Sequence, residues 1–176
     1  MEEGTSRLAF GLSALWFRMR DWLTPPAQVI SEAGIQTGDR VLDYGCGPGS
    51  HTIAVARLVG PSGKVYAADI NPMALQHVQR VAARKGLSNI QTIATSCATG
   101  LQSSTVDVVF LYDTYHDMAD GADVMQELHR VLKAGGTLSF SDHHLKEEQM
   151  LSEVAAGGLF RLSQKGRKTY HFVKEG

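Results

Sequence analysis

Val41-Leu42-Asp43-Tyr44-Gly45-Cys46-Gly47-Pro48-Gly49 joins an apolar strand pattern to a glycine-rich turn. Val41-Leu42-Asp43 predicts a strand, and glycines at 45, 47 and 49 let the backbone turn sharply and approach a ligand closely. A helix that begins after this turn offers free backbone N–H groups to a negatively charged group. Glycines also make turns that bind nothing, so the loop needs a second feature before it predicts a site.

That second feature is an acid at the end of the next predicted strand. The strand covers Lys64–Asp69, and Asp69 lies 24 residues beyond Gly45 (69 − 45). A carboxylate at this position can accept hydrogen bonds from both hydroxyls of a ribose. The Gly-x-Gly-x-Gly spacing differs from the Gly-x-Gly-x-x-Gly expected where a pyrophosphate is bound. The loop and Asp69 together predict a site for a ribose-containing ligand.

Strand and helix patterns alternate along the rest of the chain. Further strands are predicted at Ile90–Thr95, Val106–Tyr112 and Thr137–Ser141, and a closing antiparallel hairpin pairs Leu159–Ser163 with Thr169–Val173. One intervening helix begins at Asn71-Pro72, and another is expected to end at Gly135-Gly136. The alternation predicts an α/β fold: a three-layer, Rossmann-like domain with a mostly parallel sheet and a C-terminal antiparallel hairpin. A ligand crevice is expected at the carboxyl ends of the strands.

Residues 8–23 carry a broad apolar stripe at helical spacing, which ends before Pro25-Pro26. We therefore divide the chain into an N-terminal amphipathic helix, residues 1–24, and a ligand-binding domain, residues 25–176. The aromatic side chains of this helix could form a lid over a pocket together with Tyr44. A homodimer interface through the same helix is at least as compatible with the pattern.

Composition restricts the class of protein. The 176 residues include 43% hydrophobic and 20% charged residues, as is ordinary for a globular domain with one core. The net charge of −1 provides no field that would attract nucleic acid or an anionic membrane, so neither is expected as a partner. Two cysteines, Cys46 and Cys97, are too few for a disulfide framework and fit a reducing compartment. With no long apolar run, we expect a cytoplasmic protein.

These motifs resemble those of the class I S-adenosylmethionine-dependent methyltransferases, over roughly residues 25–176. Residues 41–49 resemble the first motif of that family and Ala68-Asp69-Ile70 the second. Leu132-Lys133-Ala134-Gly135-Gly136-Thr137-Leu138 is similar to the helix-to-strand signature before the fifth strand. The resemblance implies S-adenosylmethionine as cofactor and a small molecule as methyl acceptor.

The resemblance also implies the cofactor-binding residues. Asp43 and the loop residues Gly45, Cys46, Gly47 and Gly49 would hold the methionine portion. Asp69 would hold the ribose and Ile70 would pack on the adenine, and Asp113 follows the fourth strand at the same edge.

The family usually places an acid after the third strand, where it contacts the adenine amino group. Here the sequence reads Ala94-Thr95-Ser96-Cys97-Ala98, without an acid. Ser96 can still accept a hydrogen bond and Cys97 can pack on the ring. A charge-assisted bond is lost, however, and such bonds are roughly twice as strong as neutral ones.

The catalytic candidates follow the fourth and fifth strands. His116 is the candidate general base, and Asp142 and His143 are the next candidates. The fourth strand ends in Asp113-Thr114-Tyr115-His116, which differs from the Asn/Asp-Pro-Pro-Tyr motif of enzymes that methylate nucleobases. We expect no metal, although a divalent ion held by Asp113, Asp142 and a histidine, as in catechol-type members, stays open.

Two other functions stay open at this point. The first is a module that binds S-adenosylmethionine without turnover, which the missing acid suggests. The second is a nicotinamide-dependent dehydrogenase, which the glycine spacing and the terminal hairpin disfavour.

Overall fold

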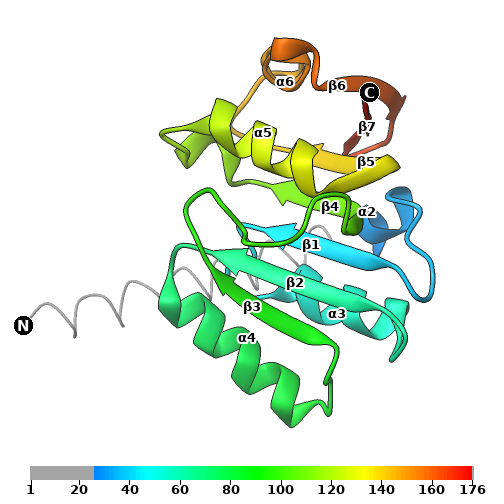
Figure 1. Cartoon of the computed structure of the whole chain (residues 1–176), viewed down its shortest axis with the longest axis vertical. Coiled ribbons are helices and arrows are strands. Elements are labelled where there is room, and N and C mark those ends of the chain that lie inside the picture. The colour runs from blue at the N-terminus through cyan, green and yellow to red at the C-terminus, as the bar shows by residue number, and fades with distance from the viewer. Residues whose placement is uncertain (1–25, 176) are drawn as a thin grey trace, which may run out of the picture.

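A computed structural model describes residues 26–175. The N-terminal helix expected over residues 1–24, with its proposed lid or dimer role, lies outside them. The described residues form a seven-stranded sheet in the order β3-β2-β1-β4-β5-β7-β6 (Figure 1). The strands are β1 (Arg40–Tyr44), β2 (Lys64–Asp69), β3 (Ile90–Ala94), β4 (Val106–Tyr112), β5 (Leu132–Ser141), β6 (Phe160–Lys165) and β7 (Tyr170–Lys174).

The helices of the described part separate these strands. They are α2 (Pro26–Glu32), α3 (Ser50–Val59), α4 (Pro72–Arg84), α5 (Gly121–Val131) and α6 (Glu147–Ala155), with short 3-10 turns η1 (Tyr115–Asp117) and η2 (Ala156–Gly158). β1 pairs in parallel with both β2 and β4, and β7 pairs antiparallel with β5 and β6. The mostly parallel sheet with a C-terminal antiparallel hairpin is therefore confirmed.

Alternating side chains of the central strands belong to two separate hydrophobic cores, one on each face of the sheet. Leu42 of β1 and Leu111 of β4 pack with α5 and α6 on one face. Their neighbours Val41 and Phe110 pack with α2 and α3 on the other. Helices thus cover both faces, which gives the predicted three layers. The chain runs outward from β1 to β2 and β3 and then crosses to β4 on the other side of β1. The strand order therefore reverses between β1 and β4, and the crevice opens where these two strands end.

The start of α4 follows its predicted local signals. Asn71 accepts a hydrogen bond from the backbone N–H of Met73 at 2.9 Å, and Pro72 occupies the first turn. Leu75, Val78 and Ala82 form its buried face. The helix therefore begins directly after the strand that ends in Asp69, and its first turn lies at the crevice.

The largest error in a predicted boundary lies between α5 and β5, whereas the bounds of β3, β6 and β7 differ from the prediction by one or two residues. Gly135-Gly136 does not end α5; the helix ends at Val131, and β5 begins at Leu132. Leu132 pairs with Val106, and the register shifts before Thr137 pairs with Val108. A Cβ on Gly136 would lie 2.9 Å from the carbonyl oxygen of Asp107, so glycine allows the two strands to approach here.

The C-terminal hairpin is attached to α2. The carboxylate of Glu32 accepts hydrogen bonds from the Thr169 hydroxyl at 2.7 Å and from the backbone N–H of Arg167 at 3.1 Å. This contact fixes the hairpin against the body of the domain. Between residues 26 and 175, no helix has the length and apolarity needed to cross a membrane.

Candidate active site

The glycine loop has a conformation that demands its glycines. Gly45, Gly47 and Gly49 have φ of +75°, +50° and +85°, in the left-handed region that other residues rarely adopt. A side chain on Gly45 would overlap the side chain of Thr114, and a Cβ on Gly49 would lie 2.6 Å from Cγ2 of Val78. The loop is therefore both sharply turned and closely packed, as the sequence predicted.

Asp69 is held in place by two backbone bonds. One carboxylate oxygen accepts from the N–H of Gly47 and the other from the N–H of Asn71, each at 2.8 Å. The first bond joins β2 directly to the glycine loop. A carboxylate oxygen can accept more than one hydrogen bond, so both oxygens can still accept from a diol. The structure thus brings the loop and the acid together, as predicted.

The loop and Asp69 line a cavity of about 430 Å³. Other walls come from Ile70, from Thr95 and Ser96 after β3, and from Asp113 after β4. Ile70 is 73% exposed, an unusual state for a large apolar side chain, and it offers a flat ligand an apolar surface. Most of the residues expected at a cofactor therefore surround one cavity.

The charge of this cavity is strongly negative. Asp69, Asp113, Asp117 and Asp120 line it, and its described lining includes no lysine, arginine or histidine. Clefts lined by one sign of charge concentrate ligands of the opposite sign. The cavity therefore favours a ligand that carries positive charge.

Asp43, Cys46 and Gly49 lie behind the cavity wall instead of on it. Asp43 is 4% exposed and accepts a hydrogen bond from the Thr52 hydroxyl at 2.5 Å. Burial raises the pKa of this carboxyl. The Cys46 side chain packs with Ala67, Leu75 and Val78, and burial raises the pKa of its thiol. The buried side chains of Asp43 and Cys46 thus support the loop from the side that faces the protein interior.

Cys97 and Tyr44 support the neighbouring wall. The Cys97 side chain packs against the core that contains α5, so it does not line the cavity as its neighbour Ser96 does. The hydroxyl of Tyr44 donates to the carbonyl oxygen of Cys97 at 3.2 Å. Tyr44 is buried at 4% exposure and belongs to this wall.

The three predicted catalytic residues meet where β4 and β5 end. The Nδ1 atom of His116 lies 2.9 Å from Asp142, whose carboxylate also accepts from the His116 backbone N–H at 3.1 Å. In the reverse sense, Asp113 accepts from Nδ1 of His143 at 2.7 Å and from its backbone N–H at 3.1 Å. The aspartate after each strand thus accepts a hydrogen bond from the histidine that follows the other strand.

His144 follows Asp142 and His143 after the fifth strand and also belongs to this cluster, although it is not among the three selected catalytic residues. Its ring centroid lies 4.0 Å from that of His116 and 3.9 Å from that of His143. The only signal in the sequence is its position next to His143. The cluster therefore contains three imidazoles and the carboxylates of Asp113 and Asp142, and the carboxylate of Asp117 lies 3.5 Å from Nε2 of His116.

The hydrogen bonds define which nitrogen of His116 can act on a ligand. Asp142 is 1% exposed, and its carboxylate can only accept, so the ring donates through Nδ1. Nε2 is the remaining ring nitrogen, and the exposed carboxylate of Asp117 lies 3.5 Å from it. His116 lines a second cavity of about 490 Å³, between η1, α5 and α6. The two cavities share Met118 and Ala119 as a wall.

A metal ion is geometrically compatible with part of the cluster. Asp113, Asp142 and His143 each offer one ligand atom, and these atoms lie within 4.8 Å of one another. Carboxylate and imidazole ligands suit several divalent metals. The same groups already hold the two strand ends together by hydrogen bonds, so the arrangement also has an explanation without an ion.

Comparison with known proteins gives a family match over most of the chain. The model of the methyltransferase domain family matches residues 35–175. The chain is 30% identical over 154 residues to a ubiquinone/menaquinone biosynthesis C-methyltransferase, UbiE, of Marinomonas sp. (strain MWYL1), covering 86% of this chain and 58% of that protein. It is 31% identical over 142 residues to a demethylmenaquinone methyltransferase of Geobacillus stearothermophilus, covering 77% and 61%. The chain thus spans about three fifths of the length of these relatives.

Solved structures share the fold. A SAM dependent methyltransferase from Aquifex aeolicus has a TM-score of 0.77 at 24% identity, over 88% of this chain and 91% of that one. A cyclase, SpnF, has a TM-score of 0.69 at 19% identity, over 79% and 58%. At these identities the likeness concerns the fold alone, and the cyclase illustrates that the fold does not define the reaction.

Proposed function

We propose that this chain, which belongs to the methyltransferase domain family, binds S-adenosylmethionine beside Gly47 and Asp69 and transfers the methyl group to a small molecule. One observation carries this proposal. Asp69 is bonded to Gly47 of the glycine loop and faces a cavity of about 430 Å³. A fixed carboxylate with free lone pairs suits the two hydroxyls of a ribose.

The charge of the cavity supports this cofactor. S-adenosylmethionine carries a sulfonium, an ammonium and a carboxylate, and is therefore a net cation. Asp69, Asp113, Asp117 and Asp120 supply the opposite charge. A nicotinamide dinucleotide would bring the two negative charges of its pyrophosphate to the same carboxylates, which disfavours a dehydrogenase.

When bound, the cofactor supplies a methyl group that is already activated. The protein then has to hold an acceptor in line and to remove a proton where the acceptor carries one. Asp142 orients His116 through Nδ1, so Nε2 is available to take that proton. Asp113 and His143 fix the neighbouring strand end in the reciprocal way. We assign His116 as the general base, Asp142 as its positioning residue and His143 as a support of the same cluster.

The acceptor is proposed as a small molecule. Relatives at about 30% identity are named for methyl transfer in ubiquinone and menaquinone biosynthesis. This chain spans only 58% and 61% of their lengths, so an acceptor of the quinone class is part of the proposal. We further propose a cytoplasmic location, no nucleic-acid partner, and a homodimer through the N-terminal helix.

Transfer of label from S-adenosylmethionine with an isotopically labelled methyl group to a metabolite extract tests the proposal. The protein should label at least one small molecule, and the Asp69→Ala variant should lose that labelling. Binding of the cofactor without transfer to any acceptor would contradict the enzyme assignment and leave a binding module. Absence of binding would contradict the cofactor assignment as well.

A further inference from the structure

The cavity contains an acid where the chain after β3 has none. Ser96 lines the cavity from the β3 side, and Asp120 lines the same cavity from the loop that leads into α5. Both side chains are exposed to solvent. A ligand that fills this cavity beyond Asp69 and Ile70 therefore meets a hydroxyl on one wall and a carboxylate on the other.

Asp120 makes no capping hydrogen bond with the helix that it precedes. It is the N-cap residue of α5, a position where aspartate usually accepts a hydrogen bond from the first turn of its helix. Here the side chain makes no such bond. Within residues 26–175 its carboxylate is bonded to no other group, so both oxygens are available to the cavity.

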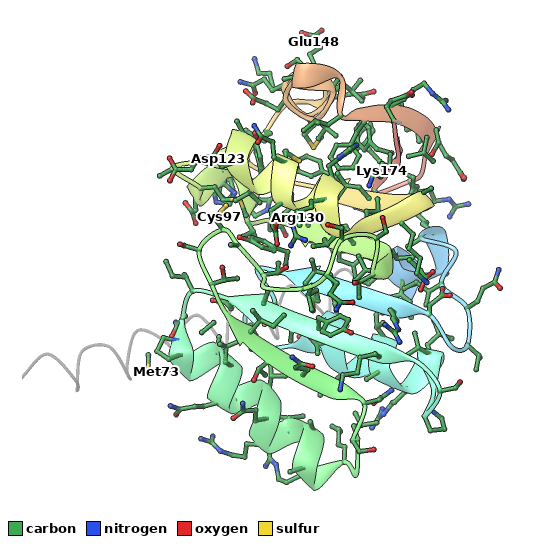
Figure 2. The ribbon with its side chains drawn as sticks, viewed as in Figure 1. Met73, Cys97, Asp123, Arg130, Glu148 and Lys174 are labelled. Carbon is green, nitrogen blue, oxygen red and sulfur yellow. The ribbon has the colours of Figure 1, made fainter. Side chains whose placement is uncertain are left out.

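The negative charge of Asp120 acts toward the β3 side of the cavity, which Asp120 lines together with Ser96. Burial raises the pKa of the Cys97 thiol, and the negative charges of Asp123, Glu127 and Asp120 raise it further. Figure 2 shows Cys97 near Asp123 at the start of α5. Since Ser96 precedes Cys97 directly, the charge of Asp120 acts on the segment from which the usual acid is missing.

The β3 wall is itself anchored to α5, so its distance from Asp120 is fixed. Glu127 of α5 accepts from the backbone N–H of Thr99 at 2.8 Å and from its hydroxyl at 2.6 Å. Arg130 of α5 donates to the carbonyl oxygen of Leu101 at 2.8 Å. One helix therefore positions both walls of this end of the cavity.

We propose that Asp120 accepts the hydrogen bond from the adenine amino group of the cofactor and replaces the acid that is missing after β3. The inference rests on the proposed function, because it assumes an adenosine ligand. It makes Asp120 a specificity-determining residue and leaves Ser96 a secondary contact. The negative charge at the adenine end is thus retained, but it comes from the β4–α5 loop.

Calorimetric titration with two ligands tests this assignment. One ligand is S-adenosylhomocysteine, and the other is its analogue with hydrogen in place of the adenine amino group. The wild type should prefer the amino form by about 10-fold or more, as expected for a hydrogen bond to a charged group. Asp120→Ala should reduce that preference to about 2-fold or less, because the acceptor is gone. Asp123→Ala removes the same charge three residues further along α5 and should keep the preference.

A double variant moves the acid from one wall to the other. In the Asp120→Ala background, Ser96→Asp should restore the preference for the amino form. An unchanged preference in Asp120→Ala, or its loss in Ser96→Ala alone, would overturn the assignment while S-adenosylhomocysteine still binds. A wild type that binds neither ligand would overturn the proposed function itself.

Discussion

His116 and Asp142 come from neighbouring strand ends, and Nδ1 of His116 lies 2.9 Å from the buried carboxylate of Asp142. The same carboxylate accepts the backbone N–H of His116 at 3.1 Å. Two bonds to one residue fix both the ring and its backbone. Because the Asp142 carboxylate only accepts, Nδ1 carries a proton. Nε2 is then the nitrogen that can exchange a proton with an acceptor, and the exposed carboxylate of Asp117 lies 3.5 Å from it. This is the arrangement that a general base requires.

We expect His116→Ala to lower turnover by about 10²–10⁴-fold, the usual contribution of a general base. The affinity for S-adenosylhomocysteine should stay nearly intact, because His116 does not line the cavity of the glycine loop. Steady-state kinetics with an acceptor found by methyl labelling, together with calorimetry, measure both quantities.

Asp142→Asn provides the companion variant. Its amide can donate to the ring and can therefore favour the wrong tautomer, so turnover should fall while the cofactor product still binds. Full turnover in His116→Ala would remove His116 from the mechanism, and full turnover in Asp142→Asn would remove Asp142 as its positioning residue. A loss seen mainly as a raised KM would mean that His116 only positions the acceptor.

Gly45→Ala should destabilise the protein more than Gly34→Ala. Both glycines have positive φ, of +75° and +67°, so alanine costs about 1–2 kcal/mol at each for backbone conformation alone. Only Gly45 would also bring its new methyl group into the side chain of Thr114, whereas Gly34 has open space. Urea unfolding of the two variants measures the difference. Equal losses of stability would show that the loop relaxes without cost.

We expect the Glu127 carboxylate to make a pH-dependent contribution to the free energy of unfolding. Burial acts to raise its pKa, but hydrogen bonds from Arg130 and Thr99 outweigh it and bring the pKa to about 2, below the ordinary 4.5. The stabilisation is therefore fully present above about pH 4.5 and is lost as the pH falls toward 2. The shift corresponds to a contribution on the order of 3 kcal/mol at neutral pH.

Glu127→Gln tests this contribution. The difference in free energy of unfolding between wild type and variant should be largest at pH 7 and should shrink below pH 4.5. Urea unfolding at pH 7 and at pH 3.5 measures it. A difference that stays constant between the two pH values would contradict the lowered pKa.

The sequence predicted the features that depend on local rules. The glycine loop, the cap at Asn71 and the alternation of elements each follow from residue types at short spacing, and the structure confirms them. The predicted end of α5 was wrong because Leu132 continues the apolar spacing of the helix but pairs with Val106 in the sheet. Periodicity cannot distinguish a buried helix position from a buried strand position.

The sequence predicted which residues of the site follow the ends of strands. It did not predict the contacts that depend on the direction of their side chains. His116, Asp142 and His143 were selected because parallel strands end at one edge. Their exchange of partners, His116 with Asp142 and Asp113 with His143, depends on contacts between distant residues. Asp43 and Cys46 lie in the loop motif, yet their side chains point into the protein. Asp120 belongs to no motif, and only the cavity brings it near Ser96.

Calorimetric titration of the wild type and of Asp69→Ala with S-adenosylhomocysteine tests the central claim most directly. We predict one site in the wild type and a loss of roughly 1.5–3 kcal/mol of binding free energy in the variant, the range for hydrogen bonds to a charged group. Asp107→Ala, which removes a carboxylate remote from the cavity, should leave binding unchanged. Equal affinity of Asp69→Ala and wild type would contradict the ribose assignment, and no binding by the wild type would contradict the proposed cofactor.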